Sequence, residues 1–193
     1  MSIINFIKLI FGTLINNFNN HKFALRFFKP KSQIVNEIKN HGFYKIDNFL
    51  DQNLCDEIIE SIKNFSDSNK QFINSDHIDS DRRIYGSEYI NSEIKNFNEN
   101  FFIKKIGEDY LDCKIECLMT LANCVKFKAN NKGSGGGWHK DSIYKQYKSI
   151  LYLNDVTDLN GPFELIKNSN KFWWSIFNIS FLNKKIFETR FEN

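Results

Sequence analysis

His139 and Asp141 are the residues whose types and spacing predict chemistry. If residues 138–141 form a strand, side chains two positions apart point to the same side, so an imidazole nitrogen and a carboxylate oxygen converge on one point. These groups are two of the three ligands of a 2-His-1-carboxylate site, which leaves coordination positions open on Fe(II). We therefore expect His139 and Asp141 to be metal ligands. The alternative is a hydrogen-bonded surface histidine at the end of a strand.

The tripeptide is not specific by itself, because the chain holds a second copy at His77-Ile78-Asp79. This copy lies in the polar stretch 66–90, for which the sequence predicts irregular structure. The Gly-rich run 132–137 precedes the first copy and has neither the spacing nor the following helix of a phosphate-binding loop. We interpret it as a flexible connection between two strands.

The second half of the chain is predicted to be rich in strands. Period-two alternation of apolar residues over 115–128 indicates a long strand. The residues on one face of this strand are Ile115, Cys117, Met119, Leu121, Val125 and Phe127. Further strands are predicted at 149–156 and 163–166, on either side of a turn signal at 160–162.

The first half is predicted to be mainly helical. Ser32 can cap a short helix that ends at Gly42, and Asp51 can cap a second helix after a short strand at 43–49. A third helix is predicted at 92–111. Its buried face would carry Ile94, Phe97, Phe101 and Tyr110. Helices followed by strands, without helical crossovers, predict an α+β fold with a mainly β core.

Two blocks of the sequence support a more specific hypothesis. The first is the stretch GFYKIDNFLDQNLCDE at 42–57. The second runs from the W-H-K-D motif at 138–141 through the apolar strand 149–156 to NGPFELIKNSNK at 160–171. In this order the blocks resemble the phytanoyl-CoA dioxygenase-like family of Fe(II)/2-oxoglutarate-dependent oxygenases. The resemblance covers roughly residues 42–171 and implies a partial double-stranded β-helix (jelly roll) preceded by N-terminal helices.

By this resemblance, His139 and Asp141 match the family's first two iron ligands. The resemblance implies Fe(II) as the metal, 2-oxoglutarate as the co-substrate and hydroxylation of a small organic substrate. A carboxylate at position 141 favours hydroxylation over halogenation, because related halogenases have a small residue there. Family members place 2-oxoglutarate contacts on the strand before the Gly-rich loop, which makes Lys126 the predicted co-substrate-binding residue; the alternative is a solvated lysine. Tyr152 is a second candidate for lining the site, or an ordinary core residue.

The sequence departs from the family pattern after Asp141. The family has a later histidine on iron and an arginine on the far carboxylate of 2-oxoglutarate, but no histidine follows Asp141, and Arg190 lacks a preceding histidine. About four core strands are predicted, where a jelly roll has eight. We therefore expect the domain at 32–193 to lack its last strands, as in a C-terminally truncated fragment of a longer oxygenase. The sequence does not decide whether this chain alone is an enzyme.

Residues 1–31 form an amphipathic, basic N-terminal extension. The segment 3–18 carries apolar residues on one helical stripe, and residues 1–31 hold five basic and no acidic residues. The segment is too short to span a bilayer, which needs about 20 apolar residues. Two interpretations remain: the stripe packs on the domain, or it contacts a membrane surface.

The composition excludes some classes of partner. Phe, Ile, Lys and Asn fill 93 of 193 positions and Arg occurs only 4 times, so bidentate phosphate recognition is poorly supported and we expect no nucleic-acid partner. The four cysteines lack zinc-finger spacing, and reduced thiols in the cytoplasm are the default interpretation. Two alternative functions stay open. One is a non-catalytic relative that acts as a binding or membrane-surface protein; the other is a cupin-like metal protein, which Asp141 disfavours.

Overall fold

The computed structural model describes residues 32–116, 119–127, 138–141, 145–158, 161–171 and 173. These residues form an α+β structure, as the sequence predicts. Its helices are α2 (Gln33–His41), α3 (Gln52–Ser68), α4 (Ser92–Asn98) and α5 (Phe101–Leu111), with the 3-10 helices η1 (Lys70–Phe72) and η2 (Ser87–Tyr89). Its strands are β1 (Asn74–Ser75), β2 (Asp81–Tyr85) and β3 (Leu121–Val125).

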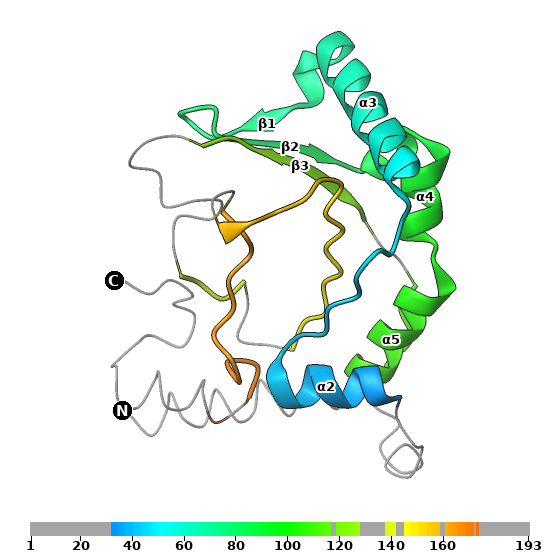
Figure 1. Ribbon diagram of the computed structural model, residues 1–193, viewed down its shortest axis with the longest axis vertical. Helices are drawn as coiled ribbons and strands as arrows, with labels where there is room; N and C mark the ends of the chain where they lie inside the picture. Colours follow the sequence, from blue (N-terminus) through cyan, green and yellow to red (C-terminus); the bar gives the residue numbers. More distant parts are fainter. Residues whose placement is uncertain are drawn as a thin grey trace.

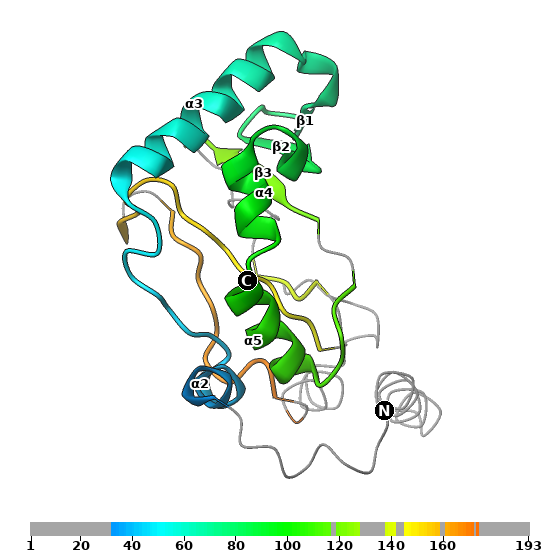
Figure 2. The same ribbon diagram turned by 90° about the vertical axis from the view of Figure 1, so that its right-hand side faces the viewer.

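In space, the three-stranded sheet lies at one end of the part that the structure describes, and α2 lies at the opposite end. Figure 1 shows α4 and α5 between these two levels, along one side of the molecule. The connection from α2 to α3 and the segments 145–158 and 161–171 also run between the sheet and α2, as the view in Figure 2 confirms. Through these long segments, residues near the end of the described chain come to lie beside α2.

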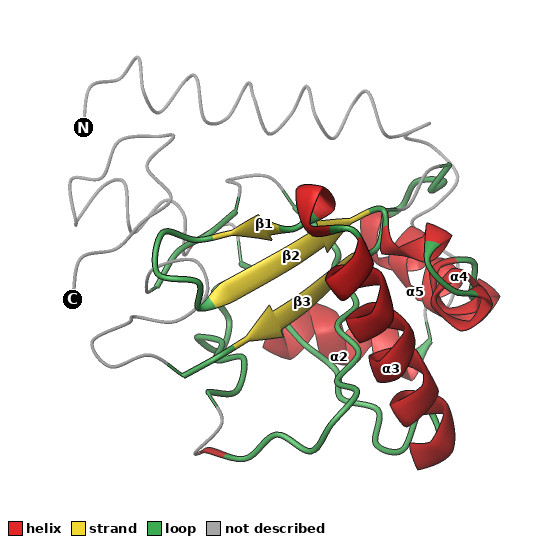
Figure 3. Ribbon diagram, turned by 90° about the horizontal axis from the view of Figure 1, so that it is seen from above, coloured by secondary structure: helices red, strands yellow, loops and turns green. Residues whose placement is uncertain are grey.

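The three strands form one antiparallel sheet in the order β1-β2-β3, with β3 at an edge (Figure 3). The turn between β1 and β2 is closed by Asp76, whose carboxylate accepts hydrogen bonds from the N–H groups of Ser80 and Asp81 at 2.6 and 3.2 Å. Residues 66–90 therefore contain two strands, and the prediction of irregular structure there was wrong. The strand β2 reads DRRIY and is mostly polar, so hydrophobic alternation does not reveal it.

Thr120, next to the start of β3, joins the sheet to the helices. Its N–H donates to the Glu88 carboxylate at 2.9 Å, and its carbonyl accepts from the Ser87 N–H at 3.0 Å. Its hydroxyl accepts from the Asn98 amide at 2.8 Å. Because Glu88 and Ser87 belong to η2 and Asn98 ends α4, these bonds fix β3 relative to both elements.

The ends of α2 and the start of α3 confirm the capping residues predicted from the sequence. The Ser32 hydroxyl accepts from the Val35 N–H at 3.3 Å, and the Asp51 carboxylate accepts from the Leu54 N–H at 2.9 Å. Gly42 ends α2 with φ of 95°, a left-handed conformation that glycine adopts without strain. These signals are local, so the sequence alone reveals them.

The single helix predicted at 92–111 is two helices. Asn91 caps α4, and Asn100 caps α5 by accepting from the Ile103 N–H at 3.1 Å. Because the helix restarts at Asn100, the apolar stripe does not run continuously through it. Phe101, predicted to be buried, is 79% exposed, whereas Ile94 and Tyr110 are buried as predicted.

The core of the described residues is mainly helical, which differs from the mainly β core predicted. Seven of the eight buried apolar residues lie on helices, and only Ile84 lies on a strand. One cluster packs α2 against α5 and consists of Val35, Ile38, Ile106 and Tyr110. The predicted inner face of the third strand is open instead: Leu121 is 39% and Val125 is 52% exposed.

Asn170 attaches the end of the described chain to α2. Its amide donates to the carbonyls of Ile38 and Lys39 at 3.0 and 3.2 Å, which satisfies two acceptors at the end of the helix. Its side chain lies 3.6 Å from the position of a Cβ on Gly42. Burial raises the pKa of Tyr110 on α5, and a hydrogen bond with Asn170 opposes that shift. Asn170 therefore links α2, α5 and the segment 161–171.

Gly107 allows the segment 145–158 to approach α5 closely. A Cβ at this position would lie 2.7 Å from Cδ1 of Tyr147 and 2.8 Å from Cδ1 of Ile115, both shorter than real Cβ contacts. The Tyr147 hydroxyl donates to the Ile103 carbonyl at 3.2 Å, and the Lys145 ammonium lies 4.1 Å from the centre of the Tyr110 ring. The beginning of this segment is thus packed tightly on one helix.

Several predicted strands do not form. Residues 43–49, 149–156 and 163–166 have no strand in the structure, and β3 covers only part of the predicted strand 115–128. Alternation of apolar residues is a local property, whereas a strand needs a hydrogen-bonded neighbour. The described residues give the first three segments no such neighbour.

Some expectations concern residues that the structure does not describe. The extension 1–31, the Gly-rich run 132–137 and Arg190 all lie outside the described residues. Within the residues that are described, none of the helices combines the length and the apolar character needed to cross a bilayer.

We predict that Asn170→Ala lowers the free energy of unfolding by about 1–2 kcal/mol, because it removes hydrogen bonds worth roughly 1 kcal/mol each. Urea denaturation should show a lower midpoint with an unchanged slope. Asn154→Ala is the matched control, since the Asn154 amide is exposed and its hydrogen bond among the described residues is to the adjacent Asp155 carbonyl, at 3.1 Å. Equal midpoints for the two variants would contradict the attachment through Asn170.

Candidate functional site

The structure brings His139 and Asp141 together. His139 forms an isolated β-bridge, and its Nε2 lies 3.3 Å from Oδ1 of Asp141. A nitrogen and an oxygen that bind one octahedral ion at about 2.1 Å, on adjacent positions, lie about 3 Å apart. The observed separation therefore fits two neighbouring ligands of one metal ion. It equally fits a hydrogen bond, so both interpretations of the sequence are compatible with this distance.

Lys148 is a third member of this group that the sequence did not predict. Its ammonium contacts Oδ2 of Asp141, the oxygen that does not face His139. The hydrogen bond from Lys148, followed by the charges of Lys148 and His139, holds the pKa of Asp141 below its usual range. The carboxylate is therefore ionised at neutral pH, as a metal ligand must be. No residue pattern connects positions 141 and 148, so only the fold reveals this contact.

The described residues supply two metal donors at this point and no third one. No group of three or more His, Cys, Asp or Glu side chains in the described part of the chain is arranged to hold a metal. In the sequence, no histidine follows Asp141. His139 and Asp141 therefore fit part of a facial triad.

The second copy of the tripeptide has a different environment. Asp79 lies in the turn between β1 and β2 with φ of 54°, and Arg82 engages both oxygens of its carboxylate. This bidentate contact is the main cause that lowers the pKa of Asp79 to about 2. A guanidinium is permanently charged, so it competes with any metal for both oxygens. The copy at 139–141 is thus the better candidate on structural grounds.

Lys126, the predicted co-substrate residue, follows β3 and is exposed. Its backbone N–H donates to the Ser80 carbonyl at 2.7 Å, and its charge is one of the causes that lower the pKa of Asp79. The groups that act on Asp141 are Lys148 and His139. Among the described contacts, Lys126 therefore interacts with residues of the β1–β2 turn, whereas Lys148 interacts with Asp141 of the candidate metal pair.

Tyr152 is half-exposed, so it is not an ordinary core residue in the described structure. Its hydroxyl accepts a hydrogen bond from the Phe163 N–H at 2.9 Å. This bond joins the segments 145–158 and 161–171, which carry the residues predicted to form the two strands after the W-H-K-D motif.

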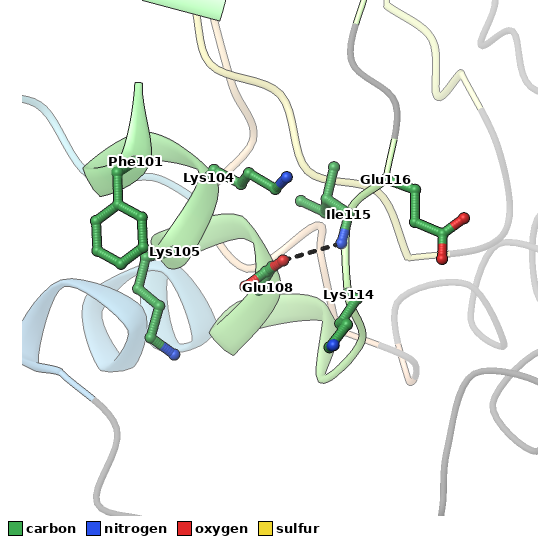
Figure 4. A pocket seen from close by; sticks show the side chains of 7 residues that line it. All are labelled: Phe101, Lys104, Lys105, Glu108, Lys114, Ile115 and Glu116. Atoms are coloured by element: carbon green, nitrogen blue, oxygen red, sulfur yellow. Dashed lines mark hydrogen bonds between the residues drawn. The ribbon is translucent and has the colours of Figure 1, made fainter. Parts of the chain in front are cut away.

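A separate groove of about 550 Å³ lies beside α5, between Phe101, Lys104, Lys105 and Glu108 on the helix and residues 114–116 after it (Figure 4). The Glu108 carboxylate accepts from the Ile115 N–H at 3.1 Å, which fixes the wall of the groove. Lys105 is paired with Asp109 at 2.6 Å. The groove holds lysines and glutamates in nearly balanced numbers and contains none of the predicted site residues.

Comparisons with known proteins add no assignment. The chain matches no protein-family model, no curated protein and no solved structure.

We predict that Lys148→Gln raises the pKa of Asp141 toward the usual value of about 3.9, because it removes the cation that favours the ionised carboxylate. The measurement is a carbon-13 NMR titration of the Asp141 carboxyl group. Lys126→Gln makes the same change of charge away from Asp141 and should leave this pKa unchanged. If the two variants shift it equally, Lys148 is not the group that acts on Asp141.

Proposed function

We propose that this chain carries the iron site of an Fe(II)- and 2-oxoglutarate-dependent dioxygenase related to the phytanoyl-CoA dioxygenase-like family, acting on a small organic substrate. The observation that supports the proposal is the 3.3 Å approach of His139 Nε2 and Asp141 Oδ1 in a W-H-K-D motif. When bound, Fe(II) activates O2 with electrons from 2-oxoglutarate, and this chemistry hydroxylates C–H bonds.

The protein residues have distinct parts in this proposal. His139 offers an imidazole nitrogen and Asp141 an ionised oxygen, which together bind a divalent cation. Lys148 holds the second oxygen of Asp141 by a charge-assisted hydrogen bond and so fixes the plane of the carboxylate. Lys148 is a positioning residue for the metal ligand in this respect.

The co-substrate needs a cation for the carboxylate that does not bind the metal. The sequence predicts Lys126 as the residue that binds this carboxylate, and Lys126 is exposed next to the end of β3. Lys148 is the second candidate, because its ammonium already lies beside Asp141. The two lysines make different predictions for substitution, so turnover can separate them.

The proposal also includes the partial jelly-roll fold that the sequence predicts. A jelly roll is built from antiparallel strand pairs, and β1, β2 and β3 form such pairs after the N-terminal helices. The segments 145–158 and 161–171 follow in the order in which the family has further strands. We propose that the sheet of this chain corresponds to one part of that fold.

Metal binding tests the iron site directly. We predict that His139→Ala and Asp141→Ala each weaken Fe(II) binding at least about tenfold in anaerobic calorimetry, because each variant keeps one donor of the pair. His77→Ala is the matched control from the second tripeptide and should bind Fe(II) as the unmodified chain does. Circular dichroism checks that each variant folds.

Turnover is the second readout of the same proposal. Release of labelled CO2 from 2-oxoglutarate should depend on His139, and either Lys126→Gln or Lys148→Gln should raise the KM for 2-oxoglutarate. Fe(II) binding that is equal in His139→Ala and His77→Ala would overturn the proposed iron site. In that event a non-catalytic binding protein is the remaining hypothesis, and association with liposomes would test membrane contact through residues 3–18.

A further inference from the structure

The outer edge of β3 carries backbone groups without a strand neighbour in the described structure. The Lys126 N–H donates to the Ser80 carbonyl of the β2 side, and donors alternate along an antiparallel strand. The N–H and C=O groups of Ala122 and Cys124 therefore face β2. Those of Leu121 and Val125, with Asn123 between them, face away from β2, toward the outer edge of the three-stranded sheet (Figure 3).

This edge lacks the features that usually prevent strand addition. Natural edge strands are protected by charges, proline, bulges or very short length. The strand LANCV has no charge, no proline and no glycine, and it is five residues long. The opposite edge of the sheet, β1, has only two residues. Strand addition is therefore expected at β3 rather than at β1.

The sequence of β3 is complementary to a second copy of itself. In an antiparallel pair centred on Asn123, each Asn123 faces the other, and Leu121 of each copy faces Val125 of the other. Each of these pairs can exchange two N–H···O=C bonds, because all three residues direct their backbone groups to the edge. Within the chain, Tyr85 lies opposite Leu121 and is 51% exposed, whereas Asp81 and Arg83 lie opposite Val125 and Asn123. The apolar contacts across the shared edge are therefore those between Leu121 and Val125.

The charge at the end of β3 is compatible with the same pairing. In this register Lys126 of one copy lies opposite Thr120 of the other. The N–H of Thr120 is bonded to the Glu88 carboxylate at 2.9 Å. Even-numbered residues of β3 direct their backbone groups to β2, so this glutamate lies on the β2 side of the strand. Within residues 120–126 Lys126 is the only charged residue, so no two like charges face each other across the shared edge.

We propose that the outer edge of β3, which has no strand neighbour among the described residues, is a dimerisation site. Two copies of this chain join their sheets there into one continuous antiparallel sheet about a two-fold axis between the two Asn123 residues. The contact is isologous, because the same strand serves both copies and the pairing closes after two chains. The inference uses none of the metal-site residues, so it stands or falls separately from the proposed function.

The oligomeric state of the full chain tests this site. We predict a dimer in sedimentation velocity, and Asn123→Lys should raise its dissociation constant at least about tenfold, because two ammonium groups then face each other at the axis. Asn74→Lys places the same substitution on the other edge of the sheet, at an exposed position of β1, and should leave the dissociation constant unchanged. A monomer for the unmodified chain, or equal dissociation constants for the two variants, would overturn the proposal.

Amide hydrogen exchange keeps the test valid if Asn123→Lys does not fold. In the unmodified chain, the N–H groups of Leu121, Asn123 and Val125 should gain protection as concentration rises through the dissociation constant. Those of Ala122 and Cys124 should be protected throughout, because they bond to β2. Protection of all five amides at every concentration would mean that a segment of the same chain covers the edge, and the dimerisation site would be wrong.

Discussion

The hydrogen bonds at Thr120 are the constraint on which the arrangement of sheet and helices depends. They satisfy the backbone N–H, the carbonyl and the hydroxyl of one residue with groups from η2 and α4. Thr120 is partly buried, and three hydrogen bonds of one residue to two different elements leave this junction few alternative geometries. The strand β3 begins directly after it, and its register with β2 follows from that starting point. The chain that leads from β3 to the W-H-K-D motif therefore begins at a fixed place.

The sequence predicted the features that depend on neighbouring residues. Caps at Ser32 and Asp51 were found because an N-cap bonds to an N–H two or three positions later. His139 and Asp141 approach each other as expected for side chains two positions apart, although only His139 forms a β-bridge and Asp141 lies in a bend. The boundary at Asn100 was missed, although asparagine is a capping residue, because apolar residues on both sides continued the helical spacing.

The sequence could not predict features that depend on distant residues. The mostly polar strand β2 is a strand because β1 and β3 supply its hydrogen bonds. Segment 149–156 has a strand-like pattern and no ladder in the described structure. The contact between Lys148 and Asp141 joins residues without any shared motif. The two copies of H-x-D show the same limit: equal in sequence, they differ because Arg82 engages Asp79 and Lys148 engages Asp141.

The absence of a side chain at Gly107 on α5 affects the candidate metal pair, His139 and Asp141, through the neighbouring residues Tyr147 and Lys148. The missing side chain lets the Tyr147 ring rest against the helix backbone, and Lys148 is the next residue along the chain. The distance between the Tyr147 ring and α5 therefore determines the position of the Lys148 backbone. That position in turn determines whether the Lys148 ammonium contacts Asp141. A methyl group at position 107 would act as a spacer between α5 and the Tyr147 ring, and would thereby change the contact between Lys148 and the Asp141 carboxylate.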